Sequence, residues 1–282
     1  MDPKFKPMLA GKAEDLSKIR YPIIATEKLD GIRCLIIDGV AYSRKMLPLP
    51  NRQLQEMASR YKDRNYDGEL WYVHEDFNFT QSKIMSEDGD LRGCHYYVFD
   101  TISEKPYLER IIDIGENDNF KKSLEFKTIG SEQQLEEYLQ ICLRNGFEGA
   151  MIRQPDSPYK FGRSTEKEQY LLKLKVFHDT EGIVIGFKER HHNTNELEKD
   201  ELGNAKRSSK KAGMVATNTL GSLELDMDGV VVSVGSGFDD TQRQDFWNRR
   251  DELLGKTVTF KYQELTKYGV PRFPVFMRFR ED

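Results

Sequence analysis

The chain has 282 residues, of which 32% are charged and 11% aromatic, and its formal net charge is −4. This acidic balance argues against a protein that coats nucleic acid through bulk positive charge, and the length suits two modest domains. No apolar run could cross a bilayer, the N-terminus lacks the core of a signal peptide, and the three separated cysteines predict no disulfide framework or zinc site, so we expect a cytoplasmic or otherwise intracellular protein with no membrane partner.

Short β-like runs open the chain. YPIIATEKL at 21–29, RCLIIDGVAYS at 33–43 and YDGELWYV at 66–73 are predicted strands, because apolar and β-branched residues dominate them. The second run contains Asp38-Gly39, a dipeptide typical of tight hairpin turns, so it is predicted to be a hairpin.

A helix and two further strands follow. SEQQLEEYLQICLRN at 131–145 predicts an amphipathic helix, because Ser131 and Gln134 have capping-box spacing and Gly146 can end it. FEGAMIR at 147–153 and LLKLKVF at 171–177 are predicted strands.

The pattern changes after His178. One helix is expected at 239–253. Five short strands are expected at 182–189, 222–229, 229–235, 256–262 and 273–279. This set predicts a small Greek-key barrel of the oligonucleotide-binding (OB) type. Between 188 and 221 lies a polar segment too long for an ordinary connection, which is either disordered or functional.

The stretch ATEKLDGIR at 25–33 is the first candidate for chemistry. If residues 25 to 30 are extended, Lys28 and Asp30 share one face and enter the same cleft. Gly31 would let the backbone approach a ligand, and Arg33 offers a planar fork for oxygen-rich groups. For an isolated Lys-x-Asp-Gly, an exposed salt bridge at a strand end is the better interpretation.

Other charged residues strengthen the functional interpretation. YDGEL places Asp67 and Glu69 on one strand face, and Glu148 begins a strand immediately before a glycine. In LLKLKVF, Leu172, Leu174 and Val176 alternate with Lys173 and Lys175, so both lysines share a face. Each pattern alone has a bland explanation as a turn or a solvated edge. Together they predict a cleft lined by lysines and carboxylates.

Such a cleft, with Phe99 nearby, suits a nucleoside triphosphate and a divalent metal. Mg²⁺ accepts one or two carboxylates and keeps most of its waters, and the candidate ligands are Asp30, Glu69 and Glu148. To act as a nucleophile, Lys28 must lose a proton that an unperturbed lysine holds up to a pKa of about 10.4. Neighbouring positive charge and exclusion of water both lower that value.

Motifs for other phosphate and metal sites are incomplete. GKT at 255–257 resembles the end of a phosphate loop, but Arg250 stands where its first glycine should be. GSGFDD at 235–240 lacks the third glycine of a dinucleotide fingerprint. His191 and His192 have no further histidine or cysteine beside them, so they are expected to be solvated.

The motifs KLDGIR, SRKM, YDGEL, HYYVFD, FEGAMIR, LLKLK and RFPVFMRFR, in this order, resemble those of covalent nucleotidyltransferases. Among these, the chain is most similar to the ATP-dependent DNA ligases, in particular the minimal two-domain type of chlorella virus. The resemblance covers nearly the whole chain. It implies an α+β nucleotidyltransferase domain of antiparallel sheets flanked by helices over 1–178, followed by an OB-fold β-barrel over 179–282 with a latch-like loop at about 189–221.

The resemblance implies a role for each nucleotide-binding residue. Lys28 would attack the α-phosphate of ATP and form a lysyl-adenylate. Thr26 would lie by the adenine, Phe99 would stack on it, and Arg33 and Glu69 would contact the ribose.

It also implies roles around the phosphates. Asp30 and Glu148 would serve metal-assisted catalysis with Mg²⁺. Lys173 and Lys175 would hold phosphate oxygens.

Four arginines match further positions of the family. Arg44 and Arg163 correspond to residues that engage the nick phosphate or AMP. Arg272 and Arg280 correspond to a terminal motif on the barrel domain, which swings over ATP for the first step.

The implied partner is nicked duplex DNA, encircled by a monomer. The basic side chains of the latch-like loop, Lys206, Arg207, Lys210 and Lys211, would contact phosphates, and binding should weaken steeply with salt. ATP is expected rather than NAD, because only 27 residues precede Lys28.

Three alternatives stay open at the level of sequence. An RNA ligase and an mRNA-capping guanylyltransferase share the lysyl-nucleotide chemistry. A non-catalytic OB-fold protein that binds nucleic acid would keep the cleft as a relic and form no covalent adduct.

Overall fold

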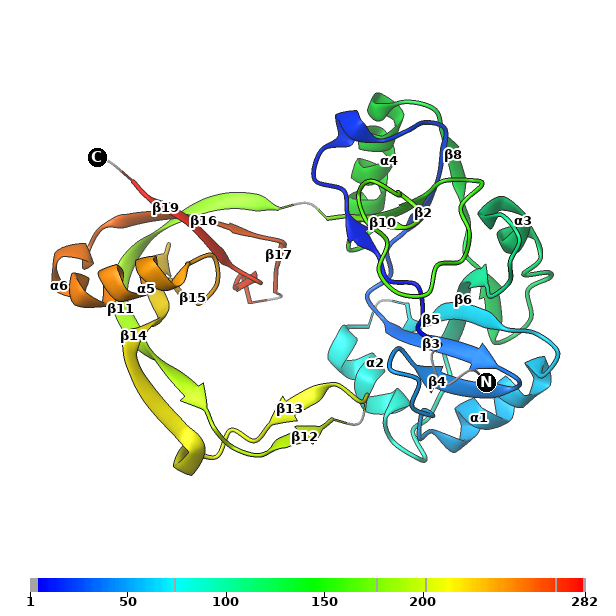
Figure 1. Cartoon of the computed structure of the whole chain (residues 1–282), viewed down its shortest axis with the longest axis horizontal. Coiled ribbons are helices and arrows are strands. Elements are labelled where there is room, and N and C mark those ends of the chain that lie inside the picture. Colours follow the sequence, from blue (N-terminus) through cyan, green and yellow to red (C-terminus); the bar gives the residue numbers. More distant parts are fainter. Residues whose placement is uncertain (1–4, 74, 176, 201, 267, 281–282) are drawn as a thin grey trace. The chain divides into compact units, whose positions relative to one another are not determined.

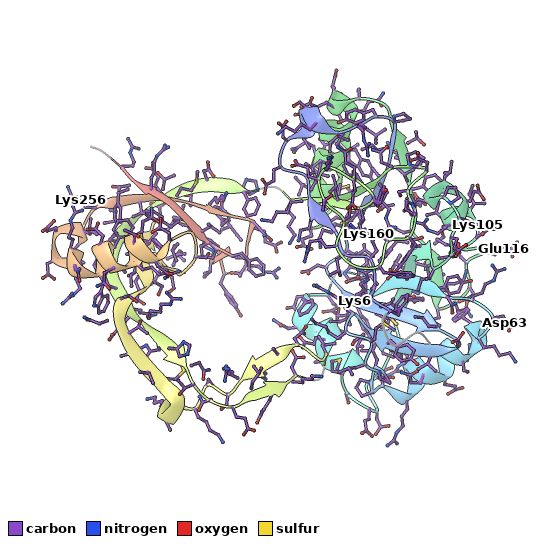
Figure 2. All side chains as sticks on the ribbon, in the orientation of Figure 1. Lys6, Asp63, Lys105, Glu116, Lys160 and Lys256 are labelled. Atoms are coloured by element: carbon purple, nitrogen blue, oxygen red, sulfur yellow. The ribbon has the colours of Figure 1, made fainter. Side chains whose placement is uncertain are left out.

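The structure is a computed structural model that describes residues 5–280 except 74, 176, 201 and 267. The chain divides into two compact units, residues 1–175 with 199–204 and residues 176–198 with 205–282 (Figure 1). Charged side chains such as Asp63, Lys105 and Lys256 are exposed on the surfaces of these units (Figure 2).

The first unit contains a five-stranded sheet in the order β4-β3-β5-β6-β7. Its strands are β3 (Ile32–Ile37), β4 (Val40–Ser43), β5 (Tyr66–Tyr72), β6 (Cys94–Thr101) and β7 (Lys121–Ser123). The helices α1 (Arg52–Ala58), α2 (Phe77–Ile84) and α3 (Tyr107–Ile112) accompany it, with a 3₁₀ turn at Ser59–Tyr61. The run Cys34–Ile37 is buried, as expected for a strand covered on both faces.

The predicted hairpin is present in this sheet. β3 and β4 are antiparallel, with Ile37 opposite Val40. The two turn residues, Asp38 and Gly39, both have positive φ, at 49° and 77°. These are the dihedral signs of the tight turn that matches the twist of paired strands. The prediction of a hairpin is therefore confirmed.

A second sheet in the same unit has the order β1-β10-β9-β2-β8. Its strands are β1 (Gly11–Lys12), β2 (Ile23–Glu27), β8 (Lys127–Ile129), β9 (Ala150–Arg153) and β10 (Leu172–Leu174). A 3₁₀ turn at Leu16–Lys18 separates β1 from β2. The strands expected at 147–153 and 171–177 are present in shortened form, and Val176 lies outside the described residues.

The predicted amphipathic helix is α4 (Glu132–Arg144). Ser131 is its N-cap and accepts a hydrogen bond from the backbone N–H of Gln134. The Gln134 side chain accepts from the N–H of Gly130 rather than from that of Ser131, so the capping box is incomplete. Gly146 follows the helix with a φ of 81°, as expected at its C-terminal end. The helical prediction is confirmed.

The second unit is built on a sheet in the order β15-β14-β11-β16-β19. Its strands are β11 (His178–Asn193), β14 (Met214–Met227), β15 (Val230–Val234), β16 (Thr257–Tyr262) and β19 (Val275–Phe279). One parallel bridge between Ser236 and Val275 joins the two edges, where the N–H of Phe276 donates to the Ser236 carbonyl at 2.8 Å. The five predicted strands are confirmed, but the barrel is joined at this seam by a single bridge rather than by a continuous ladder.

The expected helix at 239–253 is divided in two. α5 (Asp240–Asn248) begins at Asp239, which forms a complete capping box with Gln242. Arg249 ends α5 and precedes the single turn α6 (Arg250–Leu253). A small hairpin of β17 (Glu264–Leu265) and β18 (Pro271–Arg272) precedes β19.

The polar segment at 189–221 is more regular than expected. β11 continues into it as far as Asn193, and β14 begins at Met214, so much of it is a two-stranded ribbon. β12 (Leu197–Lys199), β13 (Ala205–Arg207) and a 3₁₀ turn at Lys211–Gly213 lie between them. Of the two alternatives, disorder is contradicted for the described residues of this segment, because the backbone hydrogen bonds of the two long strands extend past the core. We call residues 189–221 the ribbon.

In the described part of the chain, no helix combines the length and the apolar character that a membrane crossing demands.

Candidate active site

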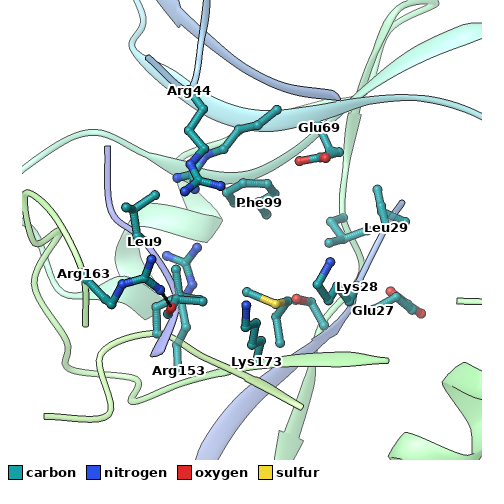
Figure 3. A pocket seen from close by; sticks show the side chains of 16 residues that line it. Leu9, Glu27, Lys28, Leu29, Arg44, Glu69, Phe99, Arg153, Arg163 and Lys173 are labelled. Atoms are coloured by element: carbon teal, nitrogen blue, oxygen red, sulfur yellow. Dashed lines mark hydrogen bonds between the residues drawn. The ribbon is translucent and has the colours of Figure 1, made fainter. Parts of the chain in front are cut away.

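A pocket of about 300 Å³ opens in the first unit, between its two sheets (Figure 3). Cationic side chains supply most of its polar lining, and apolar residues lie among them. Eight residues chosen from the sequence line it: Thr26, Lys28, Arg33, Arg44, Glu69, Phe99, Arg163 and Lys173. The other lining residues are Leu9, Ala10, Glu27, Leu29, Leu124, Met151, Arg153 and Leu171.

Lys28 sits at the end of β2, fixed by its backbone. Its N–H donates to the carbonyl of Gly149 at 2.9 Å, and its carbonyl accepts from the N–H of Glu148 at 3.1 Å. Gly149 has a φ of 147°, and a Cβ there would lie 2.2 Å from the carbonyl oxygen of Leu174. Only glycine suits such a position, so the chain can bring Glu148 beside Lys28.

The Glu148 carboxylate joins two lysines. Lys28 Nζ donates to Oε2, and Lys175 Nζ donates to Oε1. All three side chains are largely buried, with exposed fractions of 20% for Lys28, 12% for Glu148 and 19% for Lys175. Each carboxylate oxygen of Glu148 has a cationic partner. Its negative charge therefore offsets the repulsion between the two ammonium groups, which can lie close together.

Lys173 lies on β10 and lines the pocket, whereas Lys175 follows the end of that strand and is not a lining residue. β1 runs parallel to β10, with Lys12 opposite Lys173. Burial lowers the pKa of Lys173, and the charges of Lys28 and Arg163 lower it further. Lys173 therefore holds its proton less tightly than a lysine in water does.

Arg33 and Glu69 form one wall. They lie opposite each other on β3 and β5. Arg33 donates to both oxygens of Asp67, from Nε at 2.9 Å and from Nη2 at 2.5 Å. Burial raises the pKa of Glu69 to about 7, although the charges of Lys28 and Arg33 oppose this. Glu69 is therefore a half-buried acid with a pKa near neutral pH.

Phe99 faces the pocket because of a β-bulge. β5 and β6 pair Asp67 with Asp100 and then Gly68 with Val98, so Phe99 is the extra residue. Bulges of this kind re-aim a side chain next to a site. Thr26, which is only 6% exposed, and Met151 complete a slot of a size and character suited to an aromatic base.

Two arginines are held over the pocket by backbone turns. Arg44 follows Ser43 in a turn closed by the Met46 N–H, which donates to the Ser43 carbonyl at 2.8 Å. Burial lowers the pKa of Arg44, and Arg33 and Arg163 lower it further. Arg163 lies in a loop pinned to the N-terminal segment, and its Nη1 donates to the Ala10 carbonyl at 2.7 Å.

Asp30 does not line the pocket, contrary to our expectation. β2 ends at Glu27, so the alternation of faces assumed for residues 25–30 breaks before Lys28. The explanation for Gly31 was also wrong. A Cβ at Gly31 would lie 2.4 Å from the Leu70 carbonyl oxygen, so glycine permits β3 to approach β5 rather than a ligand.

The three proposed metal ligands do not form a cluster. Within the described ranges, no group of three or more His, Cys, Asp or Glu side chains is placed to hold a metal ion. Of the three, Glu69 lines the pocket and Glu148 lies beside Lys28, whereas Asp30 is not a lining residue, although its charge raises the pKa of Glu69. Mg²⁺ needs only one or two carboxylates when phosphate oxygens supply the rest, so these two residues fit such an ion.

Sequence reasoning missed Arg153 and the N-terminal segment. Arg153 lines the pocket from the end of β9 and donates to Asp100, which Arg110 also contacts at 2.7 Å. Leu9 and Ala10 also line the pocket, although they belong to an N-terminal stretch whose sequence carries no binding motif. The final arginine of FEGAMIR was a usable signal, but nothing in the sequence marks Leu9.

The remaining predicted residues lie in the second unit. Arg272 on β18 pairs with Glu264, and Arg280 pairs with Glu181 at 3.0 Å. The basic residues of the ribbon, Lys206, Arg207, Lys210 and Lys211, are all exposed. The Asn195 side chain donates to the carbonyls of Ser208 and Lys210 and thus holds this basic stretch in place.

A lysine that is held by a carboxylate and shares a pocket with further cations and an aromatic side chain is chemically suited to covalent transfer of a nucleotide to the amine. The family model described as the ATP dependent DNA ligase domain matches residues 7–175, and that of the DNA ligase OB-like domain matches 213–280. Since the first covers more than half of the chain, the chain belongs to the ATP-dependent DNA ligases. The expected fold class, enzyme class and use of ATP are confirmed.

Named relatives agree with this. DNA ligase of Haemophilus influenzae is 25% identical over 265 residues, which are 90% of this chain and 85% of the relative. DNA ligase of African swine fever virus is 26% identical over 185 residues, or 58% of this chain and 44% of the viral protein. The solved structure of chlorella virus DNA ligase-adenylate is 33% identical, with a TM-score of 0.56 and coverage of 98% of this chain and 99% of that one.

A solved Lig E DNA ligase shares the fold, with a TM-score of 0.77 at 24% identity and coverage of 98% of this chain and 99% of its own.

The half-buried acid Glu69 makes stability depend on pH in a testable way. Its pKa is about 7 in the folded protein against an ordinary 4.5, so the folded state binds its proton more tightly than the unfolded state. The stability it contributes is complete below pH 4.5 and is lost as pH rises to about 7. Glu69→Gln mimics the protonated acid, so we expect it to be more stable than the wild type above pH 7, by up to about 3 kcal/mol.

Denaturant unfolding of both proteins at pH 5 and pH 8 measures this difference. The exposed Glu56→Gln variant controls for the loss of one negative charge. A Glu69→Gln advantage that is the same at both pH values would contradict the assignment.

Proposed function

We propose that this DNA ligase binds ATP in the pocket with the base against Phe99 and the triphosphate directed at Lys28. Met151 and Thr26 would border the base, and Arg33 and Glu69 would contact the ribose between them. The observation that carries the proposal is the position of Lys28, which lines the same pocket as Phe99 and is held at both its backbone and its side chain.

The first step is nucleophilic substitution at phosphorus. The Lys28 Nζ lone pair attacks the α-phosphorus, a P–N bond forms, the bond to the β-phosphate oxygen breaks, and pyrophosphate leaves. The ammonium proton of Lys28 must be lost to solvent or to a neighbouring group. The cations around it favour that loss, since each makes a further positive charge more costly.

Two transfers complete the sealing of a nick. The 5′-phosphate of the nick attacks the lysyl-adenylate, so the P–N bond breaks and AMP becomes joined to the DNA. The 3′-hydroxyl then attacks this 5′-phosphate, a phosphodiester forms, and AMP leaves. Arg44 and Arg163, which both line the pocket, would hold the nick phosphate or the phosphate of AMP.

Lys173, Lys175 and Glu148 would prepare the nucleophile. Lys173 and Lys175 present positive charge to phosphate oxygens, whereas Glu148 holds Lys28 in place until a nucleotide arrives. Mg²⁺, held by Glu148 or Glu69 together with phosphate oxygens, would neutralise charge on the triphosphate. Asp30 would act on such an ion only through water, because it does not line the pocket.

The second unit would act on the nucleic acid. The adenylation domain is assigned to 1–178 and the OB domain to 179–282, and the matches at 7–175 and 213–280 support this division. Arg272 and Arg280 would move over ATP in the first step. The ribbon with its four exposed cations would contact phosphates as a monomeric enzyme encircles nicked duplex DNA.

Viral DNA ligases among the relatives support an enzyme that a virus encodes and that acts in the host cytoplasm. An RNA ligase or a guanylyltransferase would use the same lysine chemistry, but the DNA ligase family match favours DNA.

The covalent step is tested with α-labelled ATP and Mg²⁺. We expect label on the denatured chain that is stable in alkali and lost in acid, as for a P–N bond, and no label on Lys28→Ala. Nicked DNA, nicked RNA and labelled GTP, offered in parallel, separate the three enzymes. Binding of nicked DNA by a wild-type protein that never becomes labelled would show a non-catalytic OB-fold protein.

The role of the ribbon is tested by deleting residues 195–216. We expect nick binding to weaken more than self-adenylation, because Lys206, Arg207, Lys210 and Lys211 lie in the second unit and the deleted residues do not line the pocket of the first. The slope of log affinity against log salt should become shallower by about 0.9 for each lost phosphate contact. Lys256→Ala, which removes an exposed cation outside the ribbon, is the control. Equal loss of both activities would refute the role.

A further inference from the structure

Tyr159 carries a buried hydroxyl that neither the sequence motifs nor the mechanism above uses. The residue is 7% exposed, and its hydroxyl donates to Oδ2 of Asp67 at 2.6 Å. Asp67 itself is fully buried. Burial raises the pKa of Tyr159 well above its ordinary value, so the hydroxyl keeps its proton and donates throughout the working range of pH.

This hydrogen bond continues into the pocket. Asp67 accepts two bonds from Arg33, so its Oδ2 takes a guanidinium N–H and the phenol together, while Oδ1 takes the Arg33 Nε–H. The Arg33 guanidinium lies 5.5 Å from the centre of the Phe99 ring and lines the pocket. A chain of contacts therefore runs from Tyr159 through Asp67 to the arginine that faces the nucleotide.

The phenol has a further contact at its oxygen and one over its ring. Its oxygen accepts a hydrogen bond from the N–H of Met8 at 3.4 Å, and the Arg110 guanidinium lies 5.8 Å from its ring centre. The loop that carries it is paired with the N-terminal segment, where the N–H of Leu9 donates to the Gly162 carbonyl at 2.7 Å. A donor fixed in this way limits the rotation of the Asp67 carboxylate, and thus that of the Arg33 fork.

We propose that Tyr159 is a positioning residue that, through Asp67, aims the Arg33 guanidinium at the sugar hydroxyls of the bound nucleotide. This inference rests on the proposed function, which assigns Arg33 to the ribose. If the Tyr159 hydroxyl is removed, Arg33 keeps its ion pair with Asp67, but the two paired side chains can rotate together away from the sugar. The contact with the sugar is then lost more readily than the contacts with the base or the phosphates.

The test compares self-adenylation by Tyr159→Phe with ATP, 2′-deoxy-ATP and 3′-deoxy-ATP. We expect the KM for ATP to rise roughly threefold to tenfold, with the rate at saturation nearly unchanged, and the preference for ATP over a deoxy analogue to shrink by a similar factor. Because the preference is a ratio within one preparation, a partly unfolded sample does not alter it. Tyr72→Phe is the matched control, since that buried hydroxyl also makes a 2.6 Å bond, to the Asp90 carbonyl, and does not line the pocket.

A double-mutant cycle with Arg33→Ala shows whether Tyr159 acts through Arg33. In the Arg33→Ala background, Tyr159→Phe should leave the sugar preference unchanged. Two results would overturn the inference: equal impairment with ATP and with both deoxy analogues, or a loss of preference that persists without Arg33. If wild-type enzyme becomes labelled and Tyr159→Phe keeps the full preference, only this inference fails; if wild-type enzyme is never labelled, the proposed function fails.

Discussion

The bridge that Glu148 makes between Lys28 and Lys175 is the interaction on which the site depends. Six cationic side chains line the pocket, at positions 28, 33, 44, 153, 163 and 173, against the carboxylates of Glu27 and Glu69. Such crowding would push the lysines apart or into solvent unless a carboxylate lay between them. Glu148 supplies this carboxylate, but one negative charge does not cancel the positive charge of the pocket. The excess of positive charge remains available for a polyanionic nucleotide.

The backbone makes this bridge possible, because the N–H of Lys28 donates to the Gly149 carbonyl and the Lys28 carbonyl accepts from the N–H of Glu148. Gly149 takes a backbone conformation that residues with a side chain rarely adopt. The β-bulge at Phe99 turns that side chain into the pocket beside Lys28. Buried aspartates, Asp67 and Asp100, then hold the arginines that would otherwise repel one another. The protein accepts a half-buried acid, Glu69, whose ionisation destabilises the fold. Buried charged groups of this kind are common where an active site is formed before its ligand binds.

Much of the site could be predicted from the sequence, because its motifs are local. Lys28, Glu69, Glu148 and the alternating Lys173 and Lys175 are recognisable from residue type and spacing, and the structure gathers them as the family likeness implies. Asp30 was misplaced because the end of a strand cannot be read from alternation alone. The regularity of the ribbon was missed because polar strands beyond a core carry no hydrophobic pattern.

Other parts lay beyond sequence reasoning for a different reason. Arg153 and Tyr159 act on Asp100 and Asp67, which are 53 and 92 residues away along the chain, so no local pattern links them. Leu9 gains its place only because the N-terminal segment pairs with the loop of Arg163. Contacts of this kind depend on the packing of the two sheets of the first unit. The positions of Lys28 and its charged neighbours could be predicted from the sequence far better than those of the residues that orient them.

The most direct measurement is the identity of the residue that carries AMP. Protein incubated with ATP and Mg²⁺ would be digested, and its peptides sequenced by mass spectrometry under alkaline conditions that preserve a P–N bond. The account predicts one AMP per chain, on Lys28. An adduct on Lys173 or Lys175, or an unmodified chain after exhaustive incubation, would contradict it.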